Sequence, residues 1–248
     1  MAKIIIFILS FFDFLNKRKI KNFLKKKNFD TFNIIFDIGA HKGESINFFL
    51  NYFSVSKIIS FEASPENYKK LNSRLTSLIR KYKSTKIIIE NIGLGLKEGV
   101  HEFNQLHESS SSTFNQINVN SNYYKKKNKI LNFFSSQKSQ KIININIIPL
   151  NKYLDENNIE NIDLIKIDTE GFEFDIIRGL NSKIDNVKLI IFEHHYDDMI
   201  KKNYTFKDIN LVLKKFGFQK VFKSKMVFRK SFEYIYKNSN FWKNNLYW

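Results

Sequence analysis

Residues 36–44, Phe-Asp-Ile-Gly-Ala-His-Lys-Gly-Glu, decide the fold of this chain. An apolar run enters the stretch, and a run with apolar residues at helical spacing leaves it: Ile46, Phe49, Leu50 and Phe53. This pattern predicts a strand, a glycine-containing turn and an amphipathic helix. Backbone N–H groups at the N-terminus of such a helix can meet a ligand. The stretch therefore predicts a nucleotide-like cofactor bound at the turn.

Strand and helix patterns alternate along the chain on both sides of this turn. Apolar runs predict strands at 34–38, 57–61, 86–92, 142–148, 162–167 and 187–192. Stretches with helical periodicity follow most of these runs, among them 150–156. Such alternation predicts a doubly wound, mostly parallel sheet. In a sheet of this kind the ligand lies beyond the carboxyl ends of the strands, where the strand order switches.

Two regions depart from this alternation. We expect a hairpin formed by 100–105 and 112–117, followed by a loop or lid over 118–141, where periodicity is not clear. Further along, 218–222 and 226–229 are expected to close the sheet as an antiparallel pair. The aromatic and basic residues after this pair either pack on the sheet or bind a partner.

Polar residues and glycines gather where the predicted strands end. In chain order they are Asp37, Gly39, Glu62, Asn91, Gly93, Asp168, Glu193, His194 and His195. Parallel strands bring their carboxyl ends to one edge of a sheet, so these positions predict a single site. Their common location supports the site more strongly than any one motif does.

The turn itself favours one class of cofactor. Glu62, 25 residues after Asp37, can accept hydrogen bonds from a ribose diol. However, residues 39–43 lack the third glycine of a dinucleotide-binding turn, and the Asp37 carboxylate would repel a pyrophosphate. S-adenosylmethionine (SAM) instead carries a sulfonium and an ammonium group and no phosphate. The charge therefore favours SAM and disfavours an NAD-dependent redox enzyme.

Composition bounds the function classes. A chain of 248 residues suits one sizeable α/β domain with an appendage. The absence of cysteine excludes disulfides, thiolate metal sites, cysteine nucleophiles and cysteine-held iron–sulfur clusters. The net charge of +17 is compatible with an acidic partner. Because the lysines are dispersed and accompany many Asn, Ile and Phe residues, biased codon usage is the simpler explanation.

The first residues form a distinct segment. Residues 3–15 are apolar, but at 13 residues they are shorter than the ~20 that span a bilayer as a helix. A basic run, 17–27, follows in place of a small-residue cleavage site. Two interpretations are open: a helix that docks on the domain, or an interfacial segment with its lysines on anionic headgroups.

In several of these stretches the chain resembles the FkbM family of SAM-dependent methyltransferases. The resemblance covers about 33–230 and rests on these stretches: 36–44, 61–65, 91–94, the distinctive 165–173 and, more weakly, Ser109–Phe114. It implies a Rossmann-like class I methyltransferase fold with helices on both faces of a mostly parallel sheet. That sheet has seven strands in the order 3-2-1-4-5-7-6, with strand 7 antiparallel. The activity that it implies is O-methylation, commonly of sugar or polyketide hydroxyls.

The expected organisation follows from this match. An apolar and basic arm, 1–32, precedes the methyltransferase domain, 33–230, and an aromatic tail, 231–248, follows it. The residues expected to bind the cofactor are Asp37, Gly39, Ala40, His41, Gly43, Glu62, Asn91 and Gly93.

Methyl transfer to a hydroxyl benefits from a general base, and several side chains are candidates. Asp168 is the best placed, although it could equally hold the cofactor's amino group, and Glu170 and His195 are further candidates. His194 is preferred on intrinsic pKa, with a structural role at a strand end as its alternative. Metal dependence is not expected, because no convincing further ligand accompanies Asp168, Glu193 and His194.

The predicted function is SAM-dependent O-methylation of a sugar, glycan or related metabolite. The alternatives are an RNA ribose methyltransferase, suggested by the net charge, and a non-catalytic SAM-fold binding module. The expected partners are a small-molecule or glycan acceptor and an anionic membrane surface at 3–27; nucleic acid is the less favoured partner. The expected location is the cytoplasm, with peripheral association at the inner face of the membrane as an option.

Overall fold

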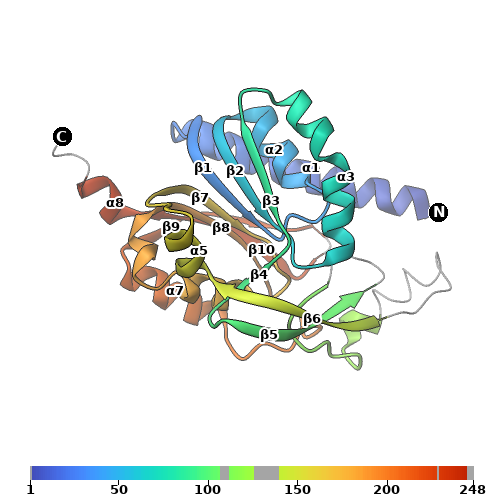
Figure 1. Ribbon diagram of the computed structural model, residues 1–248. Helices are drawn as coiled ribbons and strands as arrows, with labels where there is room; N and C mark the ends of the chain where they lie inside the picture. Colours follow the sequence, from blue (N-terminus) through green and yellow to red (C-terminus); the bar gives the residue numbers. More distant parts are fainter. Residues whose placement is uncertain (1, 107–111, 126–139, 228, 245–248) are drawn as a thin grey trace.

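The computed structural model describes residues 2–106, 112–125, 140–227 and 229–244 (Figure 1). The helices are α1 (Ala2–Lys26), α2 (Glu44–Tyr52), α3 (Pro65–Lys81), α5 (Leu150–Glu156), α6 (Glu173–Gly179), the 3-10 helix η2 (Asn181–Asn186), α7 (Phe206–Lys215) and α8 (Ser239–Asn244). The strands are β1 (Thr31–Ile38), β2 (Ser54–Phe61), β3 (Lys86–Glu90), β4 (Gly93–Gly95), β5 (Gly99–Leu106), β6 (Gln140–Pro149), β7 (Ile162–Ile167), β8 (Val187–His195), β9 (Phe218–Lys225) and β10 (Ser231–Asn238).

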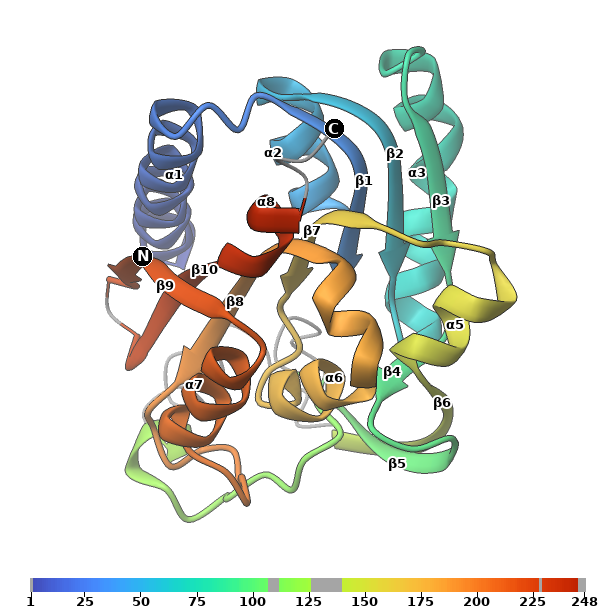
Figure 2. The ribbon, with the colours of Figure 1, turned by 90° about the vertical axis from the view of Figure 1, so that its left-hand side faces the viewer.

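The main sheet has seven strands in the order β3-β2-β1-β7-β8-β10-β9. The first five of these run parallel, whereas β10 is antiparallel to both β8 and β9. This is the 3-2-1-4-5-7-6 order with an antiparallel seventh strand, so the predicted fold is confirmed. Every residue of β7 is buried, because helices cover both faces of the sheet at its centre (Figure 2).

Two hydrophobic clusters separate the sheet from its two helical layers. On one face, α1, α2 and α3 pack on a cluster that includes Ile35, Ile46 and Leu71. On the other face, α5, α6 and α7 pack on a cluster that includes Ile165, Ile177 and Leu213. Toward the carboxyl ends of the central strands, side chains alternate between the two clusters, as Leu164 and Ile165 of β7 and Ile191 and Phe192 of β8 do.

A second, three-stranded sheet corrects two of the sequence predictions. Its order is β4-β6-β5, and β5 pairs antiparallel with β6. The expected hairpin between 100–105 and 112–117 is reduced to a single antiparallel bridge, Asn104–Thr113, and the extended partner of β5 is β6. The expected strand 86–92 is also shorter than predicted, because β3 ends at Glu90, and the following residues 93–95 form β4 in the second sheet. Most of the expected loop or lid, 118–141, lies outside the described residues.

The N-terminal arm is a helix that docks on the sheet by its second half. Ile20 and Leu24 are buried, and the Asn16 side chain donates a 2.6 Å hydrogen bond to Glu233 on β10. Asp13 forms a 3.2 Å ion pair with Arg229. These contacts support the docking-helix interpretation of this segment. Among the described residues, no helix is long and apolar enough to cross a membrane.

The end of the sheet differs from the prediction. Of the strand expected at 226–229, the described residues Met226, Val227 and Arg229 lie between β9 and β10 instead, and the pairing strand begins at Ser231. The main sheet therefore continues past the expected domain boundary at residue 230. Tyr234 and Tyr236 of β10 are buried against Phe192 of β8, which explains why this aromatic stretch is a strand.

Candidate active site

The turn between β1 and α2 brings the ends of two central strands together. Gly39 has a φ of +87°, and the N–H groups of Gly39 and Ala40 donate to the Phe61 carbonyl at 2.9 and 3.0 Å. A Cβ atom on Gly39 would lie 2.0 Å from the Asp168 carbonyl oxygen. Only glycine fits this close approach, so the turn and the loop after β7 form one wall of the site. Gly43 caps α2, and its N–H donates to the Ala40 carbonyl at 2.8 Å.

Glu62, at the end of β2, links two backbone segments beside this turn. Its Oε2 atom accepts from the His41 N–H at 2.7 Å, and its Oε1 atom accepts from the Ser64 N–H at 2.9 Å. Burial raises the pKa of Glu62, and the two amide donors oppose that shift. Each carboxylate oxygen has a second lone pair, so Glu62 can accept further hydrogen bonds from a ligand. Asn91 supports the same loop by donating to the Glu62 carbonyl at 2.8 Å.

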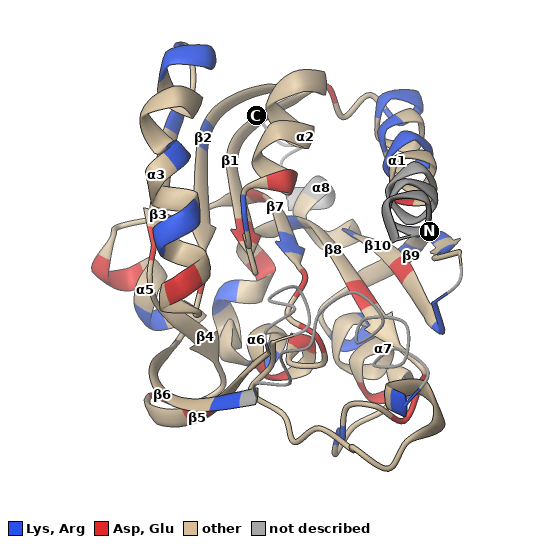
Figure 3. Cartoon of the chain, turned by 90° about the vertical axis from the view of Figure 1, so that its right-hand side faces the viewer, with Lys and Arg blue, Asp and Glu red and all other residues tan. Residues whose placement is uncertain are grey.

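Three charged residues, Asp37, Lys166 and Asp168, interact with one another where β1 and β7 end. Asp37 is fully buried, and its Oδ1 atom has no hydrogen-bond partner among the described residues. Burial raises the pKa of Asp37 to about 6, although Lys166 opposes the shift. Lys166 in turn donates a 2.8 Å hydrogen bond to Asp168, whose side chain is 39% exposed. Asp168 can therefore touch a ligand, whereas the fully buried Asp37 acts from beneath the turn. Figure 3 shows acidic residues at the ends of these strands.

The pKa of Asp168 reflects its neighbours. Burial alone favours the neutral acid, but the Lys166 ammonium outweighs this effect and lowers the pKa of Asp168.

The loop after Asp168 places Glu170 in a left-handed conformation, with a φ of +50°. Such backbone strain in a non-glycine residue is typical of functional sites.

His195 lies on the same sheet face as Asp168 and is surrounded by carboxylates. Its Nε2 atom is 3.3 Å from Glu170 and 3.4 Å from Glu193, and its Nδ1 atom is 3.4 Å from Asp197. Burial by itself lowers the pKa of His195, but these acids outweigh it and raise the pKa to about 10. His195 is therefore an imidazolium at neutral pH and cannot accept a proton there.

The charge on His195 predicts a pH-dependent stability. Its folded pKa lies above the unfolded value of about 6.5, so its contribution is complete below that pH and is lost as pH rises through about 10. We expect the unfolding free energy of the wild type to fall between pH 7 and 10, and the fall to be smaller in His195→Gln. Urea unfolding at several pH values measures this difference. The exposed His101→Gln variant is the control, and an unchanged pH slope in His195→Gln would contradict the assignment.

His194, the preferred base of the sequence analysis, lies on the opposite face of the sheet. Its Nδ1 atom is 2.7 Å from Glu173, and the side chains of the two residues are only 3% and 1% exposed. The rings of Tyr204 and Phe206 lie next to His194. The structure thus separates His194 from Asp168 and Glu170, and its contacts fit the structural alternative. Burial by itself raises the pKa of Glu173, but the hydrogen bond and charge of His194, together with the Lys202 ammonium, outweigh it and lower that pKa.

A neighbouring segment that the sequence analysis did not assign to the site holds the Asp168–Gly171 loop. Thr113 donates its hydroxyl to the Glu170 carbonyl at 2.7 Å, and Asn115 donates its amide to the Gly171 carbonyl at 2.5 Å. Phe114 packs between Phe103 and Phe172. The weak match at Ser109–Phe114 was the available signal for this segment, although 109–111 lie outside the described residues.

The structure brings most of the expected cofactor residues together, with one exception. Gly39, Ala40, His41, Gly43, Glu62 and Asn91 surround the turn, with Asp37 beneath it. Gly93 instead belongs to the second sheet, where a Cβ atom would lie 2.9 Å from both Phe114 and Ile147. The absence of a side chain at Gly93 therefore allows close packing here.

Comparisons with known proteins agree with this geometry. A sequence model described as the methyltransferase FkbM domain matches residues 37–220. No curated protein matches the chain. Among solved structures, the chain is similar to methyltransferase FkbM from Methylobacillus flagellatus KT, with a TM-score of 0.55 and 14% identity. That likeness covers 84% of this chain and 44% of the other.

Two further solved structures have a related architecture. Magnesium protoporphyrin IX methyltransferase from Synechocystis PCC 6803, with S-adenosyl-homocysteine bound, gives a TM-score of 0.52 at 9% identity, over 93% of this chain and 85% of that one. TrmK from M. capricolum, in complex with S-adenosyl-homocysteine, gives a TM-score of 0.47 at 9% identity, over 85% of this chain and 63% of that one. This chain thus spans less than half of the first protein and less than two thirds of TrmK. At these identities the first two likenesses identify the fold, which is that of class I methyltransferases, and the third carries no further weight.

Proposed function

The chain belongs to the FkbM family of methyltransferases, and from this premise we propose that it transfers the methyl group of SAM to a hydroxyl of a sugar, a glycan or a related metabolite. The observation that carries the proposal is the meeting of the 39–43 turn, Glu62 and Asp168 at one edge of the sheet. The turn and Glu62 fit the nucleoside part of a cofactor. Asp168, which is exposed after β7, fits an acceptor hydroxyl or an ammonium group.

The residues at this edge fit SAM in three respects. The glycine turn leaves room for close approach, because a Cβ atom on Gly39 would fill the cradle. Glu62 keeps lone pairs for a ribose diol while backbone amides fix its position. The Asp37 and Asp168 carboxylates favour a cationic group and disfavour a pyrophosphate. When bound, SAM supplies an activated methyl group with a neutral thioether as leaving group.

Asp168 is the residue best placed to act on the acceptor. It is exposed, it is ionised beside Lys166, and it follows the central strand β7. A carboxylate there can accept a hydrogen bond from the acceptor hydroxyl and take its proton as the oxygen is methylated. Its lowered pKa makes it a weak base, so most of its contribution is orientation of the hydroxyl. Glu170 is the second candidate, held by His195.

Two measurements test this function. Calorimetry with SAM and with NAD is expected to show binding of SAM alone, and binding of NAD alone would overturn the proposal. Mass spectrometry of glycans from cells that express the wild type is expected to reveal species heavier by one methylene unit. Cells that express Asp168→Asn, which keeps the size of the side chain, provide the matched control and should lack those species.

The net charge of +17 supports one alternative, methylation of an RNA ribose hydroxyl. Phosphate contacts make RNA affinity fall steeply with salt, whereas binding of a neutral glycan does not. An affinity for one specific RNA that exceeds the affinity for unrelated polyanions at physiological salt would favour this alternative over the glycan.

A further inference from the structure

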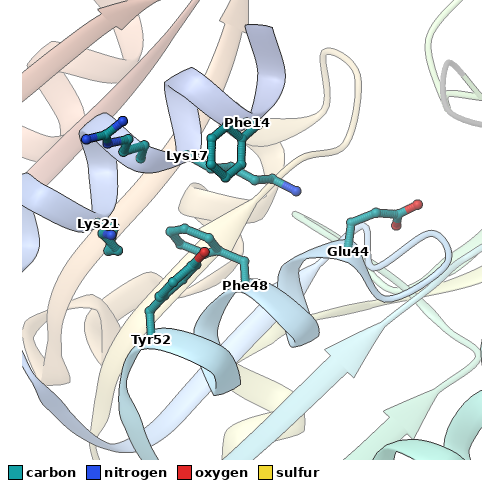
Figure 4. A pocket seen from close by; sticks show the side chains of 7 residues that line it. Phe14, Lys17, Lys21, Glu44, Phe48 and Tyr52 are labelled. Atoms are coloured by element: carbon teal, nitrogen blue, oxygen red, sulfur yellow. The ribbon is translucent and has the colours of Figure 1, made fainter. Parts of the chain in front are cut away.

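A pocket of about 420 Å³ lies between α1 and α2, and Glu44, which follows the 39–43 turn, forms part of its lining (Figure 4). Pockets that bind small molecules usually measure about 300–1,000 Å³, so its size suits a ligand rather than a water cluster. Its lining residues are Phe14, Lys17, Arg18 and Lys21 from α1 and Glu44, Phe48 and Tyr52 from α2.

The pocket arises from the two faces of α1. Asn16, Ile20 and Leu24 recur at helical spacing and are buried toward the sheet. The four lining residues of α1 are spaced i, i+3, i+4 and i+7, so they form a separate face that is turned toward α2. Because the apolar face of α1 docks on the sheet, the basic and aromatic face of α1 lies over the gap between α1 and α2.

The pocket carries unbalanced positive charge. It contains three cations and one acid, Glu44, which already accepts from the Lys42 N–H at 3.1 Å and lies 3.3 Å from the His41 ring. The Lys21 ammonium lies 4.8 Å from the centre of the Tyr52 ring. Among the residues that the structure describes, neither Lys17 nor Arg18 is paired with an acid. A doubly charged anion would neutralise this excess.

The aromatic residues add an apolar surface beside these charges. Phe14 is 52% exposed and Tyr52 is 39% exposed, which is high for large apolar rings. Phe48 lies between α1 and Tyr52, with 5.7 Å between the Phe48 and Tyr52 ring centres. An apolar or aromatic group that covered these rings would remove them from water.

We propose that this pocket binds an organic phosphate. Lys17 and Arg18 hold the phosphate group, and Phe14, Phe48 and Tyr52 pack against its apolar or aromatic substituent. A phosphate monoester carries a charge of roughly −1.5 to −2 at pH 7, which matches the excess of the pocket. Arginine and lysine are also the side chains that bind phosphate most effectively. The proposal concerns binding alone and does not depend on methyl transfer.

The ligand can come from a lipid or from a soluble metabolite, and calorimetry distinguishes these sources. The probes are phenyl phosphate, dodecyl phosphate, inorganic phosphate and phenol. We expect phenyl phosphate to bind at least about tenfold more tightly than inorganic phosphate, and phenol not to bind. Tighter binding of dodecyl phosphate than of phenyl phosphate would indicate a lipid, and the reverse would indicate a soluble aromatic ester. Absence of binding by both esters would overturn the proposal.

Matched variants on α1 locate the site. Lys17→Glu/Arg18→Glu is expected to weaken the better ester at least about tenfold. Lys19→Glu/Lys26→Glu makes the same charge change on the same helix outside the pocket and should change affinity less than about twofold. Phe14→Ala should weaken the ester and leave inorganic phosphate unchanged. An equal loss in both double variants would show that net charge alone is responsible and would overturn the site. Circular dichroism checks that each variant is folded.

Discussion

Replacing Gly39 with alanine is expected to abolish SAM binding and to lower the free energy of unfolding by about 3 kcal/mol or more. The left-handed backbone at this position costs an alanine about 1–2 kcal/mol. The larger effect is steric, because the new Cβ atom would lie 2.0 Å from the Asp168 carbonyl oxygen. The turn and the loop after β7 must then move apart, which removes the cradle proposed for the cofactor. Calorimetry with SAM and urea unfolding measure the two losses.

Gly217 provides the matched control for this variant. It also has a left-handed φ, of +79°, but the atoms nearest to a Cβ atom there belong to the exposed side chain of Asn240. We expect Gly217→Ala to lose stability and to bind SAM as the wild type does. Normal SAM binding by Gly39→Ala would show that the turn does not hold the cofactor.

Replacing Glu62 with alanine is expected to weaken SAM binding by about 100-fold, or about 3 kcal/mol. The variant loses the acceptors proposed for the ribose diol and releases the His41 and Ser64 amides that the carboxylate holds. Glu62→Gln keeps one acceptor oxygen, so its affinity for SAM should lie between those of the wild type and Glu62→Ala. Glu98→Ala, which removes an exposed acid paired with Lys152, is the control and should bind SAM normally. Equal affinities for all four proteins would contradict the proposed role of Glu62.

Much of the fold could be predicted because its central strands are short apolar runs that end in polar residues. The run 162–167 coincides with β7, and 150–156 coincides with α5. These segments are buried on both faces or amphipathic, so local pattern and tertiary environment agree. The same reasoning correctly placed Asp168 and Glu62 at one edge of the sheet.

The errors arose where partners are distant in sequence. No feature of the local sequence shows that β5 pairs along its length with β6 rather than with 112–117, because β6 follows only after a long connection. The aromatic stretch 231–238 is a strand because it inserts between β8 and β9, and that choice depends on the whole sheet.

The choice between His194 and His195 failed for a different reason. Intrinsic pKa favoured a histidine at the end of β8, but neighbouring strand residues point to opposite faces. His194 therefore pairs with Glu173, and His195 meets the carboxylates. Lys166, which holds Asp168, lies inside the 165–173 motif and was not among the predicted site residues.

The insertion of β10 between β8 and β9 constrains the order of assembly during synthesis. β9 reaches the rest of the main sheet only through β10, so it must wait until the ribosome has released residues 231–238. The second half of α1 is made long before β10, and the bond between Asn16 and Glu233 has to wait as well because it spans 217 positions of the chain. Contacts over such separations form slowly. The nascent chain therefore keeps one flank of its central strands uncovered until β10 has been made, and a chaperone would matter most during that interval.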